Sequence, residues 1–377
     1  MNLYAFELGR EKDLCFAELE AMFGPCVERC SETAIFSMDE VQNPQKLQDS
    51  LGGTIKIIKI IEEGHSLKRS IENLLKEEFT DASGKIPFSI SVLNYKNNRE
   101  IDIKGLLNFS KKVMKSLGLN SRFVNKNFQN TRPSTIFKAK VIQKGIDINV
   151  LKTHSTQYIG KTVSIQNIDS YSKRDFSKPK RDAKVGMLPP KLAQIMINLA
   201  GPDTKRIYDP FCGTGTVLTE SMLMGKDAIG SDLESTLVKY SEENCNWLAQ
   251  QYNTQQSVRV FTRDARFINK EVVPEKIDAI VTEGYLGEPL RFKPYPKRQE
   301  EIFRELANLH LNWLRAATSL TDKVVMCVTA LRSEEGVVHF PRFEELADTA
   351  GWGIASKHLY GRDDQIVLRD IMVLEKY

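Results

Sequence analysis

The stretch Asp209-Pro-Phe-Cys-Gly-Thr-Gly-Thr216 constrains the fold of this chain more than any other feature. It follows a short run of strand-forming residues, Arg206 to Asp209, and precedes residues 217–224, whose apolar positions have helical spacing. A strand that passes through a glycine turn into a helix is the repeating unit of a doubly wound parallel sheet. Because Gly213 and Gly215 have no Cβ atoms, we expect the backbone of this turn to approach a ligand closely.

Three more predicted strands follow, and each leads to a polar or glycine-rich tip. They cover residues 227–233, 258–262 and 277–282. The first contains Asp232, about twenty residues after the glycines, where an acidic side chain binds both hydroxyls of a ribose. The second leads to Asp264-Ala265, which is placed to receive the edge of an adenine ring, and the third leads to Glu283-Gly284-Tyr285. The pattern therefore predicts a ligand that contains adenosine.

Enzymes that bind dinucleotides share the glycine turn and the ribose acid, but three details argue against that class. Position 218 is Leu, so the third glycine of the G-x-G-x-x-G pattern is missing. Asp209 precedes the turn and would repel a pyrophosphate. Residues 353–374 are predicted to form a hairpin and not a further βα unit. S-adenosyl-L-methionine, a sulfonium cation without a phosphate, suits the site better.

Ten residues are predicted to bind this cofactor, because they lie in the glycine turn, at the strand tips or in the segment before the first helix. They are Asp209, Phe211, Gly213, Thr214, Gly215, Asp232, Leu233, Asp264, Ala265 and Met187. Residues 184–187 are a candidate lid over the methionine end of the cofactor. The two aspartates at 232 and 264 have an alternative role, since Asp is a common helix cap at such turns.

Several of these motifs resemble the class I methyltransferases that modify RNA amino groups. The closest resemblance is to the THUMP-domain tRNA (guanine-10) N2-methyltransferases. The motifs are Asp209 to Thr216, Gly230-Ser-Asp-Leu233, Arg263-Asp-Ala-Arg266 and the C-terminal hairpin. Further segments are similar to the last strand of the family's THUMP domain, to its entry into the catalytic domain and to its ferredoxin-like domain. These segments are 157–166, 180–190 and 4–9.

The resemblance implies an α/β chain with a ferredoxin-like domain (1–65), a THUMP-like RNA-binding domain (66–168), a basic linker (169–189) and a class I catalytic domain (190–377). The catalytic domain would be a doubly wound, Rossmann-like sheet of seven strands whose last hairpin is antiparallel. The implied activity is the S-adenosyl-L-methionine-dependent N2-methylation of guanosine in tRNA. The eukaryotic relatives of the family also allow a small activating partner protein.

The tip of the fourth strand departs from the family pattern. Most members have Asp-Pro-Pro-Tyr, in which the acid and a backbone carbonyl accept the amine protons and the aromatic ring stacks on the flipped base. This chain has Thr282-Glu283-Gly284-Tyr285. Aligning the carboxylate places Glu283 at the acid but loses both prolines and the stacking tyrosine, whereas aligning Tyr285 with the family's tyrosine places Thr282 at the acid. The candidate catalytic residues are Glu283, Tyr285 and Thr282. The sequence leaves both registers open.

Charge is distributed unevenly along the chain. The chain has 53 Lys and Arg and 49 Asp and Glu. Nineteen of the basic residues but only four of the acidic residues lie in the stretch from Lys104 to Lys191. That stretch carries +15 and the remainder −11, which is the footprint expected of a protein that binds a polyanion. Aromatic residues interleave with the charges and are suited to stacking on unpaired bases. The predicted RNA-binding residues are Arg132, Lys138, Lys173, Arg174, Lys180 and Arg181.

The remaining composition favours a soluble cytoplasmic protein without metal. The first residues lack the basic and apolar run of a secretory signal, and no segment approaches the roughly 18 apolar residues of a membrane span. Six scattered cysteines do not suggest a disulfide framework. Cys26 and Cys30 would supply half of a metal site, but no further close pair of Cys or His accompanies them.

Two other functions stay open. A DNA amino-methyltransferase shares the same catalytic core, although a folded THUMP-like module in place of a long target-recognition insert argues against it. A catalytically degenerate RNA-binding protein is the second alternative. Gly284 favours it, because glycine in place of proline raises the cost of ordering the catalytic tip.

Overall fold

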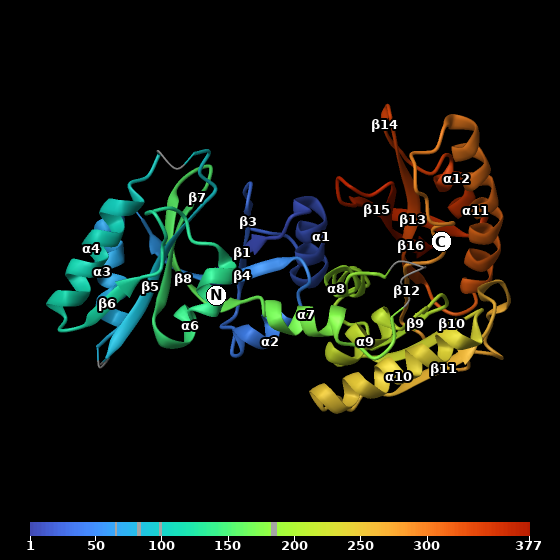
Figure 1. The fold of residues 1–377 in the computed structure, drawn as a ribbon, viewed down its shortest axis with the longest axis horizontal. Helices are drawn as coiled ribbons and strands as arrows, with labels where there is room; N and C mark the ends of the chain where they lie inside the picture. Colours follow the sequence, from blue (N-terminus) through green and yellow to red (C-terminus); the bar gives the residue numbers. More distant parts are fainter. Residues whose placement is uncertain (65, 81–83, 98–99, 182–186) are drawn as a thin grey trace. The chain divides into compact units, whose positions relative to one another are not determined.

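The computed structural model describes residues 1–64, 66–80, 84–97, 100–181 and 187–377. The chain folds into two compact units, Met1–Asp169 and Ser170–Tyr377 (Figure 1). Along the part of the chain that the structure describes, no helix is both long and apolar enough to cross a bilayer.

The first unit is built on one eight-stranded sheet. Its elements are β1 (Asn2–Leu8), α1 (Lys12–Phe23), β2 (Glu28–Arg29), β3 (Thr33–Met38), α2 (Pro44–Asp49), β4 (Thr54–Glu63), α3 (Leu67–Glu78), β5 (Lys85–Leu93), α4 (Ile103–Ser116), β6 (Asn120–Phe123), α5 (Pro133–Lys138), α6 (Val141–Lys144), β7 (Ile146–Lys152) and β8 (Gln157–Ile165). The helices α3 and α4 pack an apolar core against β5 and β7.

The sheet of the first unit is continuous across the predicted boundary at residue 65. The strand order is β2-β3-β1-β4-β8-β7-β5-β6, and β4 pairs with β1 on one side and with β8 on the other. The expected ferredoxin-like and THUMP-like modules therefore share backbone hydrogen bonds through β4. Sequence patterns do not reveal this pairing, because β4 and β8 are about a hundred residues apart and neither pattern specifies its neighbour.

A buried polar network also joins the two expected modules. The ammonium group of Lys56 in β4 lies 3.1 Å from the carboxylate of Asp147 in β7 and 3.4 Å from that of Glu7. The Asp147 carboxylate also accepts hydrogen bonds from the hydroxyls of Ser89 and Thr162. Lys56 and Asp147 are fully buried, so each charge depends on the other for its solvation.

Replacing Asp147 with alanine leaves the Lys56 ammonium buried without its main partner. We expect a loss of about 3–5 kcal/mol in the free energy of unfolding of this unit, measured by denaturant titration. Because the sheet is shared, hydrogen exchange of β1 and β5 amides should accelerate together. Lys161→Ala is the control, since its pair with Glu78 is half-exposed and should contribute less than about 1 kcal/mol. Exchange that accelerates only around β5 and β7 would contradict the shared sheet.

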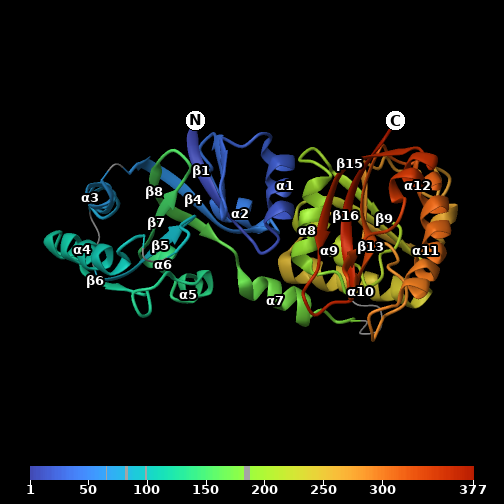
Figure 2. The ribbon, with the colours of Figure 1, turned by 90° about the horizontal axis from the view of Figure 1, so that it is seen from above.

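The second unit contains a doubly wound sheet. Its elements are α8 (Pro190–Leu199), β9 (Arg206–Asp209), α9 (Thr216–Leu223), β10 (Asp227–Asp232), α10 (Ser235–Tyr252), β11 (Val258–Thr262), the 3₁₀ turn η1 (Ala265–Phe267), β12 (Ala279–Thr282), α11 (Pro296–Ala317), β13 (Lys323–Ser333), β14 (Gly336–Val338), α12 (Phe343–Thr349), β15 (Trp352–Tyr360) and β16 (Val367–Lys376). Figure 2 shows α8 and α9 on one side of the strands and α11 and α12 on the other.

The order of the strands brings their carboxyl ends to one edge. The main path is β11-β10-β9-β12-β13-β16-β15, and the first five of these strands run parallel to one another. The closing hairpin places β16 antiparallel to both β13 and β15, as predicted. The seven predicted strands form this path, and the short β14 adds an eighth by pairing with the end of β13. The order in which successive strands are added to the sheet reverses between β9 and β12. Open α/β sheets bind their ligands at such a point.

The predicted linker, residues 169–189, is helical in its first part. Helix α7 spans Ile168–Phe176, and the structure divides the two units at Asp169. Arg174 in α7 is buried and donates a 2.8 Å hydrogen bond from Nε to Glu220 in α9. The Arg174 guanidinium group therefore attaches α7 to the sheet domain, which argues against the predicted contact of Arg174 with RNA.

Candidate functional site

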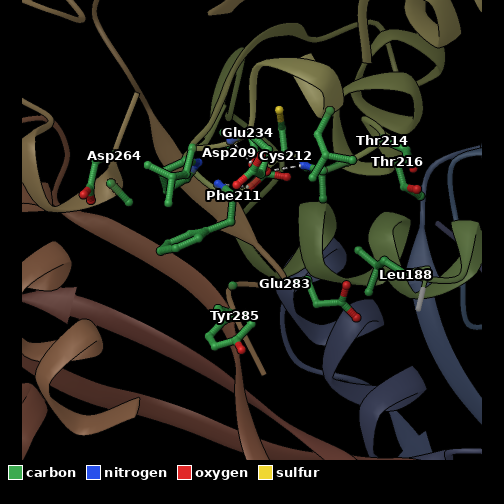
Figure 3. Close-up of a pocket in the computed structure, with 18 of the residues that line it drawn as sticks. Leu188, Asp209, Phe211, Cys212, Thr214, Thr216, Glu234, Asp264, Glu283 and Tyr285 are labelled. Carbon is green, nitrogen blue, oxygen red and sulfur yellow. Dashed lines mark hydrogen bonds between the residues drawn. The ribbon is translucent and has the colours of Figure 1, made fainter. Parts of the chain in front are cut away.

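A cavity of about 410 Å³ lies at the carboxyl edge of β9, β10 and β12 (Figure 3). This volume is in the range of small-molecule sites. Most of the residues that the sequence predicts for cofactor binding and catalysis line it. They are Met187, Asp209, Phe211, Gly213, Thr214, Asp232, Leu233, Asp264, Ala265, Glu283 and Tyr285. Two predicted residues, Gly215 and Thr282, do not line it.

Asp209 is the most deeply buried carboxylate of the pocket. One of its oxygens accepts a hydrogen bond from the amide of Phe211 at 3.1 Å. Burial raises the pKa of Asp209 to about 7, and the nearby charges of Asp232 and Glu283 act in the same direction, while the hydrogen bonds from Thr282 and Phe211 oppose them. Asp209 is therefore close to the midpoint of its titration at neutral pH.

Asp232 is held in a fixed orientation by the backbone. Its two carboxylate oxygens accept hydrogen bonds from the amides of Gly213, at 2.9 Å, and Glu234, at 3.0 Å. Burial raises the pKa of Asp232, although these hydrogen bonds act to lower it. The bond to Gly213 ties the tip of β10 to the glycine turn after β9, so both strand ends form one wall of the cavity.

The two glycines of the turn have different roles. Gly213 has a φ of +52°, and a Cβ atom added there would meet nothing within 4 Å, so it leaves free space beside the cavity. Gly215 has a φ of +81° and precedes α9, and an added Cβ would lie 2.8 Å from the hydroxyl of Ser241. Gly215 thus has a packing role, because its lack of a Cβ atom lets the turn approach α10, and its contact with the cofactor stays a prediction.

Asp264 lines the pocket, but its carboxylate is already bound by the neighbouring Arg266. Its side chain caps the turn η1 by accepting from the amide of Arg266, and it also forms an ion pair with that residue's guanidinium group at 2.6 Å. The hydrogen bond from Arg266 holds the pKa of Asp264 below its usual range. The capping role considered for Asp264 is therefore present, and the adjacent backbone at Ala265 remains open to the cavity.

The two candidate acids at the tip of β12 differ in their exposure to the cavity. Thr282 is the last residue of β12 and is fully buried, and its hydroxyl accepts a hydrogen bond from the amide of Gly284 at 3.1 Å. It is thus Glu283, and not Thr282, that presents a side chain to the cavity. Gly284 has a φ of +69°, which a proline ring cannot adopt. The backbone after β12 therefore follows a different path from any Pro-Pro sequence.

Glu283 is bound by an arginine that the sequence did not reveal. Arg369 in β16 places Nε at 2.7 Å and a terminal nitrogen at 2.6 Å from the same carboxylate oxygen, Oε1. Both side chains are largely buried, with 10% and 19% of their surfaces exposed for Arg369 and Glu283. Among the described residues, the second oxygen, Oε2, has no hydrogen-bond partner. Arg369 therefore fixes the orientation of the Glu283 carboxylate and leaves one oxygen available.

Aromatic rings form the apolar part of the pocket. Phe211 packs edge-to-face against Trp313, with ring centroids 5.6 Å apart, and its ring lies between the acidic residues and Tyr285 in Figure 3. Tyr285 is exposed, and its hydroxyl donates a 3.1 Å hydrogen bond to Glu288. The arrangement offers flat apolar surfaces next to a cluster of carboxylates.

Sequence reasoning missed several residues of the site. Leu188, Glu234, Leu237, Arg266 and Leu309 line the cavity, and Arg369 supports Glu283. Glu234 could have been found, because it follows Asp232 on the same strand tip. Arg369 and Leu309 carry no local signal, since each reaches the cavity only through the folding of a distant element.

The residues predicted to bind RNA are distributed over both units. Arg132 and Lys138 flank α5 in the first unit and are exposed. Lys173 donates to Gln251, Lys180 pairs with Glu243, and Arg181 lies over the ring of Phe176, all in the second unit. Of the candidate lid, residues 184–186 lie outside the described residues, and Met187 lines the cavity.

Three potential metal ligands meet in the first unit. Glu28, Cys30 and His154 lie within 4.8 Å of one another. The Glu28 carboxylate already accepts the backbone amide of His154 at 2.8 Å and lies 2.9 Å from its Nδ1 atom. Burial raises the pKa of the Cys30 thiol to about 11. These hydrogen bonds already engage the Glu28 carboxylate with His154.

Comparisons with known proteins agree with this geometry. The model of the RMKL-like methyltransferase domain family matches residues 178–340. The second unit is a methyltransferase domain. A DNA methylase family model matches residues 91–243, which cross the division between the units and end before the tip of β12.

Among curated proteins, the chain is similar to archaeal tRNA (guanine(10)-N2)-dimethyltransferases. That of Methanothermobacter thermautotrophicus is 34% identical over 146 residues, which are 38% of this chain and 39% of the relative. That of Pyrococcus abyssi is 31% identical over 178 residues, 46% of each chain. The chain thus spans less than half the length of the curated relatives it matches. The structure of TrmN from Thermus thermophilus aligns over 100% of both chains with a TM-score of 0.50 and 15% identity, a likeness of fold.

The pocket of the methyltransferase domain fits S-adenosyl-L-methionine better than a dinucleotide. Among the described residues, five carboxylates line it, against a single guanidinium group that is already paired. The carboxylates are those of Asp209, Asp232, Glu234, Asp264 and Glu283. This charge favours a cationic ligand and would repel a pyrophosphate. Asp232, with its oxygens fixed by backbone amides, is the residue that would hold the ribose.

The raised pKa of Asp209 predicts how the free energy of unfolding depends on pH. Because its pKa is about 7 in the fold and near 4 when unfolded, the unfolded chain loses the proton first as the pH rises. Below about pH 4 Asp209 is protonated in both states and does not reduce the free energy of unfolding. As the pH rises from about 4 to 7, its burial lowers that free energy progressively, by up to about 4 kcal/mol. In Asp209→Asn that cost should vanish, so the variant should gain stability over the wild type between pH 5 and pH 8 in denaturant titrations.

Asp227, at the other end of β10, provides a control of opposite sign. Burial acts to raise its pKa, but hydrogen bonds from Ser257 and Arg206 outweigh it and hold the pKa below the usual range. Asp227→Asn should therefore lose stability relative to the wild type once the pH exceeds about 4. A pH dependence of Asp209→Asn that matches the wild type would contradict the raised pKa of the buried Asp209 carboxyl.

Proposed function

We propose that this protein is an S-adenosyl-L-methionine-dependent RNA methyltransferase that modifies an exocyclic base amine, namely N2 of guanosine in tRNA. The observation that carries the proposal is the Glu283 carboxylate at the cavity, with Oε1 held by Arg369 and Oε2 without a partner among the described residues. An amine that is to be methylated has N–H groups to donate, and the free oxygen is a matching acceptor.

The chemistry of the amine explains why such an acceptor is needed. The lone pair of an exocyclic guanine nitrogen is delocalised into the ring, which makes it a weak nucleophile. A hydrogen bond from its N–H group to Glu283 would localise the pair and stabilise the positive charge that develops on nitrogen. Arg369 keeps the carboxylate oriented, so little reorganisation is needed during the reaction. When bound, S-adenosyl-L-methionine supplies the electrophilic methyl group.

The remaining residues of the site would orient the two reactants and exclude water. Methyl transfer is an in-line displacement, for which alignment is the main contribution of a protein. Asp232 and the backbone at Ala265 would hold the adenosine, and Phe211 would cover its apolar side. Tyr285, which is exposed at the rim, is suited to stack on a base that has been extruded from its helix.

The substrate class is supported by relatives and by charge. The curated proteins similar to this chain are named tRNA (guanine(10)-N2)-dimethyltransferases. The stretch from Lys104 to Lys191, with its charge of +15, suits binding of a polyanion such as tRNA. Arg132, Lys138, Lys173, Lys180 and Arg181 remain the proposed RNA contacts. We also propose that the protein is cytoplasmic and that it requires a small activating partner protein.

The direct test is methylation of tRNA by the purified chain with labelled cofactor. Nucleoside mass spectrometry should find N2-methylguanosine, and it distinguishes one added methyl group from two. Label that enters only DNA would favour the DNA amino-methyltransferase. Cofactor binding without turnover on tRNA, with or without a cell extract as a source of an activator, would favour a degenerate RNA-binding protein.

Variants at Glu283 and Arg369 test the proposed mechanism. Glu283→Gln should lower kcat by about a hundredfold or more, because it removes the charge that stabilises the transition state, with little change in cofactor affinity. Arg369→Met should lower kcat in the same direction, and Arg369→Lys should restore part of it. The control is Arg342→Met, whose exposed partner Glu345 lies on α12 away from the cavity. An unchanged kcat in Glu283→Gln would exclude Glu283 as the acceptor.

A further inference from the structure

A segment directly after the catalytic tip exposes two aromatic rings. Residues 289–298, here called the aromatic segment, follow Tyr285 and lead into α11. Phe292 is 83% exposed and Tyr295 is 64% exposed. Exposed rings side by side in one short segment are costly to hydrate, and such surfaces mark sites of interaction.

The backbone of the aromatic segment is fixed from beneath. Leu290 packs against the main core of the methyltransferase domain. Pro294 is buried, and its carbonyl accepts a 2.7 Å hydrogen bond from the side-chain amide of Gln299. Pro294 and Pro296 also restrict the backbone dihedrals on both sides of Tyr295. The two rings are therefore held outward by an anchored chain and lose little freedom when they bind a partner.

The charge of the aromatic segment points to an anionic partner. It contains four Lys and Arg and no Asp or Glu. Lys293 pairs with Glu334, and Arg298 pairs with Glu301. Arg291 and Lys297 are exposed and have no ion pair or hydrogen bond with any described residue. Rings and unpaired cations in alternation are the combination that binds unpaired nucleotides, by stacking on bases and by contact with phosphates.

We infer that the aromatic segment binds the unpaired nucleotides next to the target base. The inference rests on the proposed function. A base that enters the cavity past Tyr285 leaves its neighbours without a stacking partner, and the aromatic segment is the next part of the chain after Tyr285 and Glu288. Phe292 and Tyr295 replace the lost stacking, while Arg291 and Lys297 contact the adjoining phosphates.

The test compares the full chain with the double variant Phe292→Ala/Tyr295→Ala. Stacking of this kind changes affinity by roughly tenfold or more per ring, so KM for tRNA should rise at least about tenfold while affinity for the demethylated cofactor stays unchanged. The aromatic-preserving variant Phe292→Trp/Tyr295→Phe should behave as the wild type. Tyr377→Ala, which removes an equally exposed ring at the far end of β16, is the matched control.

A binding assay separates this inference from the proposed function. A labelled single-stranded RNA oligonucleotide should bind the wild type more tightly than an RNA duplex of the same sequence, and the double alanine variant should lose this preference. Arg291→Gln/Lys297→Gln should reduce the salt dependence of binding and keep the preference. If the wild type methylates no RNA but shows this pattern, the proposed function fails, and what stands is that the aromatic segment binds unpaired nucleotides.

Two results would overturn the inference. One is a double alanine variant that binds oligonucleotides and methylates tRNA as the wild type does, which would leave the rings to a protein partner. The other is an aromatic-preserving variant that is as weak as the alanine variant, which would show that stacking is not the interaction involved.

Discussion

The position of β9 between β10 and β12 is the constraint on which the rest of the methyltransferase domain depends. Parallel pairing on both sides brings the carboxyl ends of these strands to one edge, where Asp209, Asp232 and Glu283 converge. Three carboxylates so close together repel one another, and burial adds to the cost. The structure relieves this repulsion through a raised pKa at Asp209, backbone amides at Asp232 and Arg369 at Glu283.

Under the proposed function, the same arrangement would let one pocket serve two reactants. The acids at β9 and β10 would form a cradle for the cationic cofactor. The tip of β12 would face the other reactant, since Gly284 turns the chain so that Glu283 enters the cavity and Tyr285 stands at its rim. The aromatic segment follows this rim directly in the sequence. The substrate side of the site is thus a single stretch of backbone, from Thr282 to α11, anchored at both ends.

The parts of the site that depend on local sequence were predictable. The glycine turn and the spacing to Asp232 identified one wall of the cavity, because both follow from a single βαβ unit. The sequence did not reveal Arg369, which reaches Glu283 from 86 residues away. It also could not show that Gly215 packs on Ser241, or that β4 joins two expected modules into one sheet. Such features depend on which distant elements become neighbours, and hydrophobic periodicity predicts the type of each element but not its neighbours.

Isothermal titration of the purified chain with S-adenosyl-L-methionine tests the central claim most directly. A pocket walled by oriented carboxylates should bind one molecule per chain, and Asp232→Asn should weaken binding by at least about tenfold, because it removes a charge whose oxygens the backbone aims at the ribose. Heat of binding that Asp232→Asn leaves unchanged, or no heat with either the cofactor or its demethylated product, would contradict the assignment of this cavity.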